Sequence, residues 1–263
     1  MKIVWMTDPH ILAAGKTLVG HDPVMRLKSA VDYVSQHHSD ADFCILSGDL
    51  TDEGDAESYG IVREILSSCP VSTYSIPGNH DNRSVMREHL PFPENIDAEF
   101  IQYSIVQEGQ RLILLDSLQD NEAEGILCAE RLKWLDEELA IHKDLPTVVF
   151  CHHPPGELYL PMMDQEQTHY GDKLLDRLCA APNVRHLFFG HVHRPVSGNF
   201  RGLSFTALQS TAIQVPLPYP AWDWDSFSPA AEAPAVGIIH TTPDNVVVHF
   251  HAFCKALDYV APA

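Results

Sequence analysis

The sequence has little positive charge. Its 17 Lys and Arg residues stand against 36 Asp and Glu residues, which gives a formal net charge of −19 over 263 residues. Proteins that bind nucleic acids usually carry a basic patch against the phosphates, so this balance argues against a stable nucleic-acid complex. It leaves a small phosphate substrate open, because bound divalent cations would reverse the sign of the charge locally.

Long hydrophobic runs and paired-cysteine motifs are also missing. No run of about 18 apolar residues occurs, which excludes a transmembrane helix. The N-terminus, MKIVWMTDPH, has one Lys and a very short apolar run. It predicts a buried strand rather than a secretory signal, and therefore a cytoplasmic protein with no membrane partner. The six cysteines are irregularly spaced, which favours buried, reduced thiols over a disulfide or an interface cysteine.

Short apolar runs alternate with segments of helical periodicity along most of the chain. This alternation predicts βαβ units and a largely parallel sheet in an α/β fold. The expected strands are 2–6, 43–47, 71–76, 101–106, 111–115, 147–151 and 184–189. After about Val196 the helical pattern ends, and strands 203–208, 236–240 and 246–253 are expected to pair as antiparallel edge or cap strands.

Residues 214–234 form a proline-rich stretch that also holds Trp222 and Trp224. Such a density of prolines predicts irregular structure. Aromatic residues on a long loop need something to pack against, so the loop is a lid, a subunit contact or a plain surface loop.

Histidine is unusually frequent, with 16 residues, and several follow the predicted strands. Five segments at strand ends carry Asp, Asn or His: Asp8-Pro9-His10, Gly48-Asp49, Gly78-Asn79-His80-Asp81, Cys151-His152-His153 and Gly190-His191-Val192-His193. In open α/β sheets, sites form at the carboxyl ends of the strands, so these side chains are expected to converge. Any one of the segments is a weak signal, but all five in order are a strong one.

The ligand types in these segments point to two metal ions. Carboxylate, amide oxygen and imidazole suit Mn, Fe, Co or Zn, and the absence of thiolates disfavours a structural zinc site. About seven candidate ligands are too many for one ion but right for two ions that share a carboxylate. A pair of this kind clamps a phosphoryl group for in-line displacement.

The series D-x-H, G-D, G-N-H-D, H and G-H-x-H resembles the calcineurin-like metallophosphoesterase superfamily over roughly residues 1–195. The tail motif Ser210-Thr211…Gln214-Val215-Pro216 resembles the class III group of cyclic-nucleotide phosphodiesterases and glycerophosphodiesterases. His152-His153-Pro154-Pro155 and Gly20-His21-Asp22 fit the same group. This resemblance implies a four-layer α/β/β/α sandwich with a small C-terminal β cap. It also implies a catalytic core at 1–197 and, integrated with it, C-terminal strands and a cap or dimerisation segment at 198–263.

By the same resemblance, each metal ion has four ligands. One ion would be bound by Asp8, His10, Asp49 and His193. The other would be bound by Asp49, Asn79, His152 and His191, with Asp49 as the bridge. The implied activity is hydrolysis of small phosphodiesters, either glycerophosphodiesters or 3′,5′-cyclic nucleotides, by a metal-bound hydroxide. The relatives also imply a homodimer or higher homo-oligomer.

The resemblance makes His80 a catalytic residue that does not bind metal and that protonates the leaving group or stabilises the transition state. Asp52 matches a position that in some relatives orients that histidine. His21 and His169 flank motif strands and could reach the substrate or support the site. His153 should point to the opposite side of its strand from His152.

Three other functions compete with this prediction. A phosphomonoesterase on the same metal core would need basic residues for a dianionic phosphate, and only Arg83 and Arg194 lie close to motifs. A repair-type nuclease fits poorly with the acidic balance and the short chain. A metal-free scaffold of the same fold should show broken motifs, and here every motif is intact.

Overall fold

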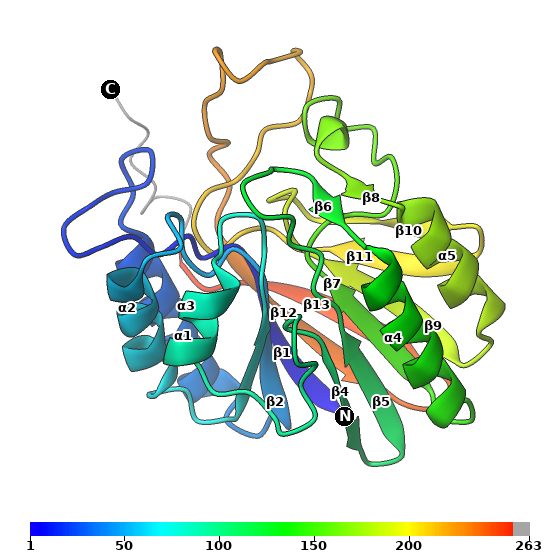
Figure 1. Cartoon of the computed structure of the whole chain (residues 1–263). Coiled ribbons are helices and arrows are strands. Elements are labelled where there is room, and N and C mark those ends of the chain that lie inside the picture. Colours follow the sequence, from blue (N-terminus) through cyan, green and yellow to red (C-terminus); the bar gives the residue numbers. More distant parts are fainter. Residues whose placement is uncertain (255–263) are drawn as a thin grey trace.

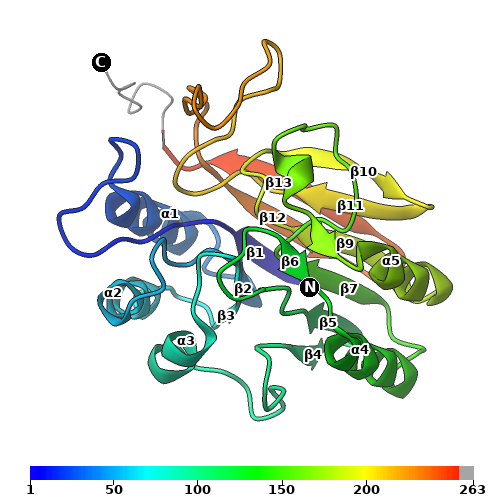
Figure 2. The same ribbon diagram turned by 45° about the horizontal axis from the view of Figure 1, so that its top comes forward.

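The computed structural model describes residues 1–254, in which two β-sheets lie face to face (Figures 1 and 2). The first sheet has the order β13 (Val246–Ala252), β12 (Ala235–Thr241), β1 (Lys2–Met6), β2 (Phe43–Ser47), β3 (Thr73–Ile76). The second has the order β10 (Val196–Phe200), β11 (Leu203–Ala207), β9 (Val184–Phe189), β7 (Thr147–Cys151), β5 (Gln110–Leu114), β4 (Tyr103–Gln107). A short pair, β6 (Gly125–Ile126) and β8 (Thr168–His169), lies beside them.

Helices cover the outer face of each sheet. α1 (Pro23–His37), α2 (Ala56–Leu66) and α3 (Arg83–His89) flank the first sheet, and α4 (Ala129–Ile141) and α5 (Gly171–Ala180) flank the second (Figure 1). Leu27, Val31 and Val34 of α1 are buried at helical spacing, as expected of an apolar stripe that packs on a sheet. The predicted four-layer α/β/β/α arrangement is therefore confirmed.

The layer between the two sheets is the main core. Trp5 of β1 lies edge-on to Phe150 of β7 and Phe188 of β9, with ring centroids 6.0 and 5.1 Å apart. The indole nitrogen of Trp5 donates a hydrogen bond of 2.8 Å to the hydroxyl of Ser47. A buried Trp thus contributes apolar area while its one polar atom keeps a partner. This packing fixes the ends of β1, β2, β7 and β9 next to one another.

The C-terminal strands differ from the predicted small β cap, because they extend the two sheets instead of forming a layer of their own. β12 pairs antiparallel with β1, from Lys2↔His240 to Trp5↔Gly237, and β13 lies outside β12. β11 pairs parallel with β9, where an antiparallel edge was expected, and β10 closes that edge. The chain after Val196 therefore returns to both sheets that carry the motif segments.

Within residues 1–254, no helix has the length and apolarity needed to cross a membrane. Cys44 and Cys151 are buried as expected, but Cys69, Cys128 and Cys254 are only partly buried and Cys179 is exposed, so the expectation of buried thiols holds at two positions. The division into residues 1–197 and 198–263 stays a prediction, and residues 255–263 of the second part lie outside the described range.

Candidate metal centre

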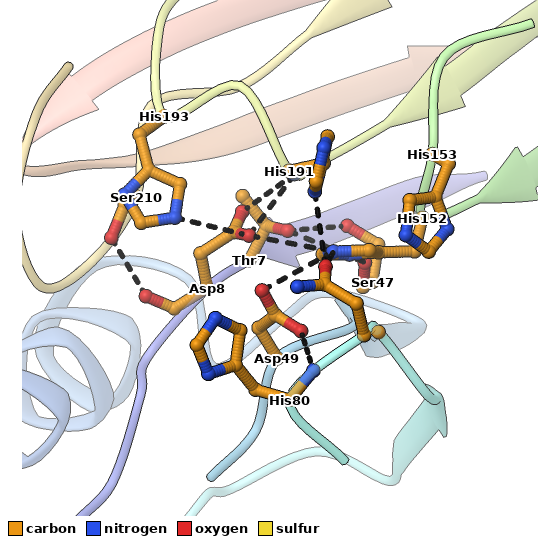
Figure 3. Close-up of polar contacts among 12 residues, drawn as sticks. Thr7, Asp8, Ser47, Asp49, His80, His152, His153, His191, His193 and Ser210 are labelled. Atoms are coloured by element: carbon orange, nitrogen blue, oxygen red, sulfur yellow. Dashed lines mark hydrogen bonds and ion pairs between the residues drawn. The ribbon is translucent and has the colours of Figure 1, made fainter. Parts of the chain in front are cut away.

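The five motif segments converge at the carboxyl ends of β1, β2, β3, β7 and β9, as the sequence predicts (Figure 3). Five of the predicted ligands lie at positive φ: Asp8 (51°), His10 (45°), Asp49 (49°), His191 (67°) and His193 (48°). Non-glycine residues rarely adopt this region, and such strain is concentrated at functional sites. These five residues follow β1, β2 and β9, where the chain turns and their side chains meet at the site.

The first cluster holds the four residues predicted for one metal ion. One possible ligand atom from each of Asp8, His10, Asp49 and His193 lies within 4.8 Å of the others, and all four side chains are buried. His193 Nε2 is 3.4 Å from Asp8 Oδ1, and His10 Nε2 is 3.5 Å from Asp49 Oδ2.

The hydrogen bonds of these imidazoles require a cation between them. His10 Nδ1 donates to Asp52 Oδ1 (2.9 Å), and His193 Nδ1 donates to the carbonyl oxygen of Ile213 (2.9 Å). In the neutral imidazoles the Nε2 atoms then carry lone pairs, and these two atoms lie 3.0 Å apart. Two lone pairs at this distance repel unless a proton or a metal ion lies between them.

The second cluster consists of His152, His153 and His191, which offer ligand atoms within 4.8 Å of one another, and Asn79 lies next to two of them. His152 Nδ1 donates to the carbonyl oxygen of Ser47 (2.8 Å), which turns its Nε2 toward Asp49 Oδ2 (3.3 Å) and Asn79 Oδ1 (3.2 Å). His191 presents its other nitrogen, with Nδ1 3.1 Å from Asn79 Oδ1. Asp49 contacts both clusters, since its Oδ2 lies 3.5 Å from His10 Nε2 and 3.3 Å from His152 Nε2.

The electrostatics of the site also favour positive charge. Burial opposes ionisation of Asp49, but His152 and His80 outweigh it and hold the pKa of that carboxyl well below its usual range. Burial opposes protonation of His152, yet Asp49 and Asp8 raise its pKa to about 9. Burial, together with His152, lowers the pKa of His191 to about 3, so that imidazole is neutral and able to bind a metal. The donor set therefore fits two divalent cations.

His80 lies at the mouth of the site, with its side chain 40% exposed. Its backbone N–H donates to Asp49 Oδ1 (2.9 Å), and its Nδ1 donates to the backbone carbonyl of Asp52 (2.9 Å). Its Nε2 atom is therefore left for a substrate. Burial lowers the pKa of His80, but Asp49 and the Asp52 carbonyl outweigh it and raise the pKa, so the ring can hold a proton.

Asp52 divides its contacts between two histidines. Its carboxylate oxygen is 2.9 Å from His10 Nδ1 and 3.5 Å from His80 Nδ1. The predicted orientation of His80 by Asp52 thus comes mainly from the backbone carbonyl. The carboxylate fixes the tautomer of His10 instead, as carboxylates do for metal-binding histidines.

Asp81 is a buried residue whose role was not predicted from the sequence. Its carboxylate accepts hydrogen bonds from the backbone N–H groups of Leu50, Thr51 and Gly78 and from the Tyr59 hydroxyl. It therefore joins the loop that carries Asp49 to the loop that carries Asn79 and His80. Its place in the motif G-N-H-D was the available signal.

The tail motif, residues 210–216, makes hydrogen bonds to two residues of the site, Asp8 and His193. Ser210 Oγ donates to the carbonyl oxygen of Asp8 (2.7 Å) and accepts from the N–H groups of Ala212 and Ile213 (Figure 3). Ile213 in turn supplies the carbonyl that fixes His193. The resemblance in this tail thus corresponds to a segment that fixes a strained turn.

His21 and His169 are not brought to the centre. His21 is buried beside Arg26, at 3.2 Å from its guanidinium, and His169 is exposed on β8. Neither lines the cavity next to the ligands.

His153 does not point away from His152 as predicted. The two rings lie 4.8 Å apart, because β7 ends at Cys151 and strand alternation stops there. One nitrogen of His153 contacts the hydroxyl of Ser117 and the other the carbonyl of Ala123.

A cavity of about 170 Å³ opens over both clusters. Besides His80 and ligand residues, its lining includes Met163, Glu166, Trp224 and Phe227. Trp224 and Phe227 belong to the irregular loop 214–234, where they and Trp222 pack on one another with ring centroids 5.4 to 5.7 Å apart. The loop therefore covers part of the site, which agrees with the lid interpretation. No motif or periodicity in the sequence pointed to Glu166.

The fold and the clustered ligands together define a metallophosphoesterase. The family model described as calcineurin-like phosphoesterase matches residues 1–195, and the chain belongs to this family.

Curated relatives and a solved structure agree with this family. The chain is 33% identical over 259 residues to a probable cyclic nucleotide phosphodiesterase from Rhodopseudomonas palustris, covering 96% of this chain and 93% of the relative. It is 30% identical over 222 residues to the glycerophosphodiester phosphodiesterase GpdQ of Enterobacter lignolyticus, covering 82% and 79%. A dimetal phosphatase from Danio rerio has a similar fold, with a TM-score of 0.71, 14% identity and 97% of each chain covered.

Proposed function

We propose that this protein hydrolyses small phosphodiesters at a centre of two divalent metal ions. The observation that carries the proposal is the pair of imidazole lone pairs, His10 Nε2 and His193 Nε2, facing each other at 3.0 Å. Each ring is held in that tautomer by an acceptor on its other nitrogen. A buried site built in this way is stable only around positive charge.

The proposed ligands follow the two clusters. Asp8, His10, Asp49 and His193 would hold one ion, and Asp49, Asn79, His152 and His191 the other. When bound, the ions would lower the pKa of a water molecule that they share and take up charge on the phosphoryl oxygens.

His80 would protonate the leaving oxygen. Its Nδ1 is fixed on the Asp52 carbonyl, so its Nε2 faces the cavity. Asp49, which accepts from the backbone N–H of His80, keeps the ring at a fixed place beside the metal pair. A positioned acid of this kind contributes roughly 10²- to 10⁴-fold to a rate.

Charge favours a diester over a monoester. Among residues 1–254, none of those that line the cavity is Lys or Arg. Arg83 is paired with Asp116 (2.7 Å) and Asp120 (2.8 Å), and Arg194 with Glu232 (3.1 Å). Both basic residues near the motifs are thus engaged elsewhere, and a dianionic phosphomonoester would meet neither of them in the cavity.

The substrate class comes from the relatives. They are named cyclic nucleotide and glycerophosphodiester phosphodiesterases, so 3′,5′-cyclic nucleotides and glycerophosphodiesters are the proposed substrates. Trp224 and Phe227 give the cavity an aromatic wall against which the organic part of such an ester could pack.

The remaining parts of the proposal concern the metals and the assembly. Fe, Mn, Zn and Co all suit the ligand set. A homodimer or higher homo-oligomer is proposed, with support from the exposed Leu217 and Tyr219 of the loop 214–234, and light scattering would test it. The cytoplasmic location stays a prediction.

The decisive experiment combines elemental analysis with a substrate panel. Protein loaded with Mn or with Fe and Zn should contain two ions per chain. It should hydrolyse bis(p-nitrophenyl) phosphate faster than p-nitrophenyl phosphate, and cyclic AMP or glycerophosphoethanolamine as well. A much faster monoester rate would contradict the proposal and favour the phosphomonoesterase alternative, and a chain without stoichiometric metal would indicate the scaffold.

A further inference from the structure

Two carboxylates that line the cavity, Asp52 and Glu166, are not among the proposed ligands, and Asp52 already contacts His10 and His80. Glu166 lines the same cavity as Asp49, Asn79, His80 and His191. Its side chain is only 20% exposed, and its Oε2 atom lies 3.7 Å from His191 Nε2. That nitrogen is buried and has no hydrogen-bond partner within the described residues. Glu166 therefore places a carboxylate on the wall of the cavity that the substrate phosphate would enter.

Hydrogen bonds hold the loop that carries Glu166 in place. It follows η1 (Met163–Gln165), whose Asp164 carboxylate accepts from the backbone N–H groups of Leu158 and Leu160, both at 2.8 Å. The N–H of Glu166 donates to the carbonyl of Met163 (3.1 Å), and Met163 is buried. Because these bonds hold the loop, the carboxylate stays at the cavity wall.

We propose that Glu166 is a specificity-determining residue that disfavours dianionic phosphomonoesters relative to monoanionic phosphodiesters. This inference rests on the proposed function of the metal centre. A monoester carries a second negative charge at pH 8, because its second pKa is about 6. Repulsion between that extra charge and a carboxylate across a partly hydrated cavity corresponds to roughly ten- to hundredfold in binding. The diester carries no second charge, so it does not experience this additional repulsion.

The test compares Glu166→Gln with a matched control, Glu157→Gln. Glu157 lies on the same loop, is exposed and does not line the cavity. At pH 8, with both metals loaded, kcat/KM is measured for p-nitrophenyl phosphate and bis(p-nitrophenyl) phosphate. We expect Glu166→Gln to raise the monoester-to-diester ratio about tenfold, Glu157→Gln to leave it unchanged, and Glu166→Asp to keep most of the discrimination.

Binding supplies a second readout that does not depend on turnover. Calorimetry should show that Glu166→Gln tightens binding of inorganic phosphate about tenfold more than binding of dimethyl phosphate. An unchanged preference in both assays would overturn the inference. So would a parallel fall of both rates and of metal content, because Glu166 would then act only by positioning His191. If the loaded wild type hydrolysed neither ester, the proposed function would fail, while the anion-binding comparison would still decide the role of Glu166.

Discussion

The Asp81 carboxylate is expected to contribute more to the free energy of unfolding than an exposed polar side chain, because it is buried and holds several hydrogen bonds. Its buried carboxylate accepts from three backbone N–H groups, those of Leu50 (3.1 Å), Thr51 (3.2 Å) and Gly78 (2.9 Å), and from the Tyr59 hydroxyl (2.7 Å). Asp81→Ala would leave these donors buried without an acceptor. Each such group costs about 1–3 kcal/mol, and relaxation or an entering water recovers part of this. We expect Asp81→Ala to lower the free energy of unfolding by about 4 kcal/mol in total.

This loss can be converted to a melting temperature. A chain of 263 residues has an unfolding entropy of about 0.55 kcal/mol/K. The melting temperature of Asp81→Ala should therefore be about 7 °C below that of the wild type. Thermal unfolding followed by circular dichroism, in excess chelator, measures the effect in the metal-free protein.

Two variants make the measurement specific. Asp81→Asn keeps one acceptor oxygen and should lose about half as much. Asp55→Ala removes the N-cap of α2, where Asp55 accepts from Ser58 N–H near the surface, and should cost about 1 kcal/mol, or about 2 °C. If Asp81→Ala melted within 2 °C of the wild type, the idea that this carboxylate joins the two ligand loops would be wrong.

Three further results are expected. His80→Ala should lower kcat by at least about 100-fold while elemental analysis still finds both metals, since His80 is proposed as an acid and not a ligand; loss of metal would refute the assignment. Metal at about 100 times its Kd should stabilise the folded protein by about 2.7 kcal/mol per site. Two sites should therefore raise the melting temperature by about 10 °C over that of the protein in chelator. Calorimetry that showed no shift would contradict the proposed sites. Gly78→Ala would place a Cβ atom 2.2 Å from Asp49 Oδ1 and should abolish stoichiometric metal binding. Gly60→Ala in α2, whose Cβ would meet no atom of the described residues within 4 Å, should bind metal as the wild type does.

The sequence located the strands that carry the ligands because each is a buried apolar run. β1, β2, β7 and β9 begin and end at the predicted residues. α3 and β10 were missed for a physical reason. α3 has seven residues and one buried side chain, Met86, and most of β10 is exposed on a sheet edge, so neither shows a clear hydrophobic period.

The positions of the proposed ligands were predictable for the same reason, since each follows such a strand closely. Glu166, Trp224 and Phe227 were not, because they belong to irregular loops. Their side chains meet the ligands only through contacts between distant parts of the sequence, such as Glu166 with His191 or Trp224 and Phe227 beside His80. Loop contacts of this kind leave no periodicity in the sequence, although they are the contacts that shape the space for a substrate.

The C-terminal segment belongs to the metal centre as much as the motif strands do. The family match ends at residue 195, yet Ser210 holds the carbonyl of Asp8 and Ile213 fixes the tautomer of His193. Asp8 and His193 both lie at positive φ, a conformation that persists only when the surrounding structure over-determines it. Because the tail makes these bonds and its loop also lines the cavity, a change in this segment can alter metal affinity and substrate choice together, whereas a change in the helices that cover the sheets would act on stability alone.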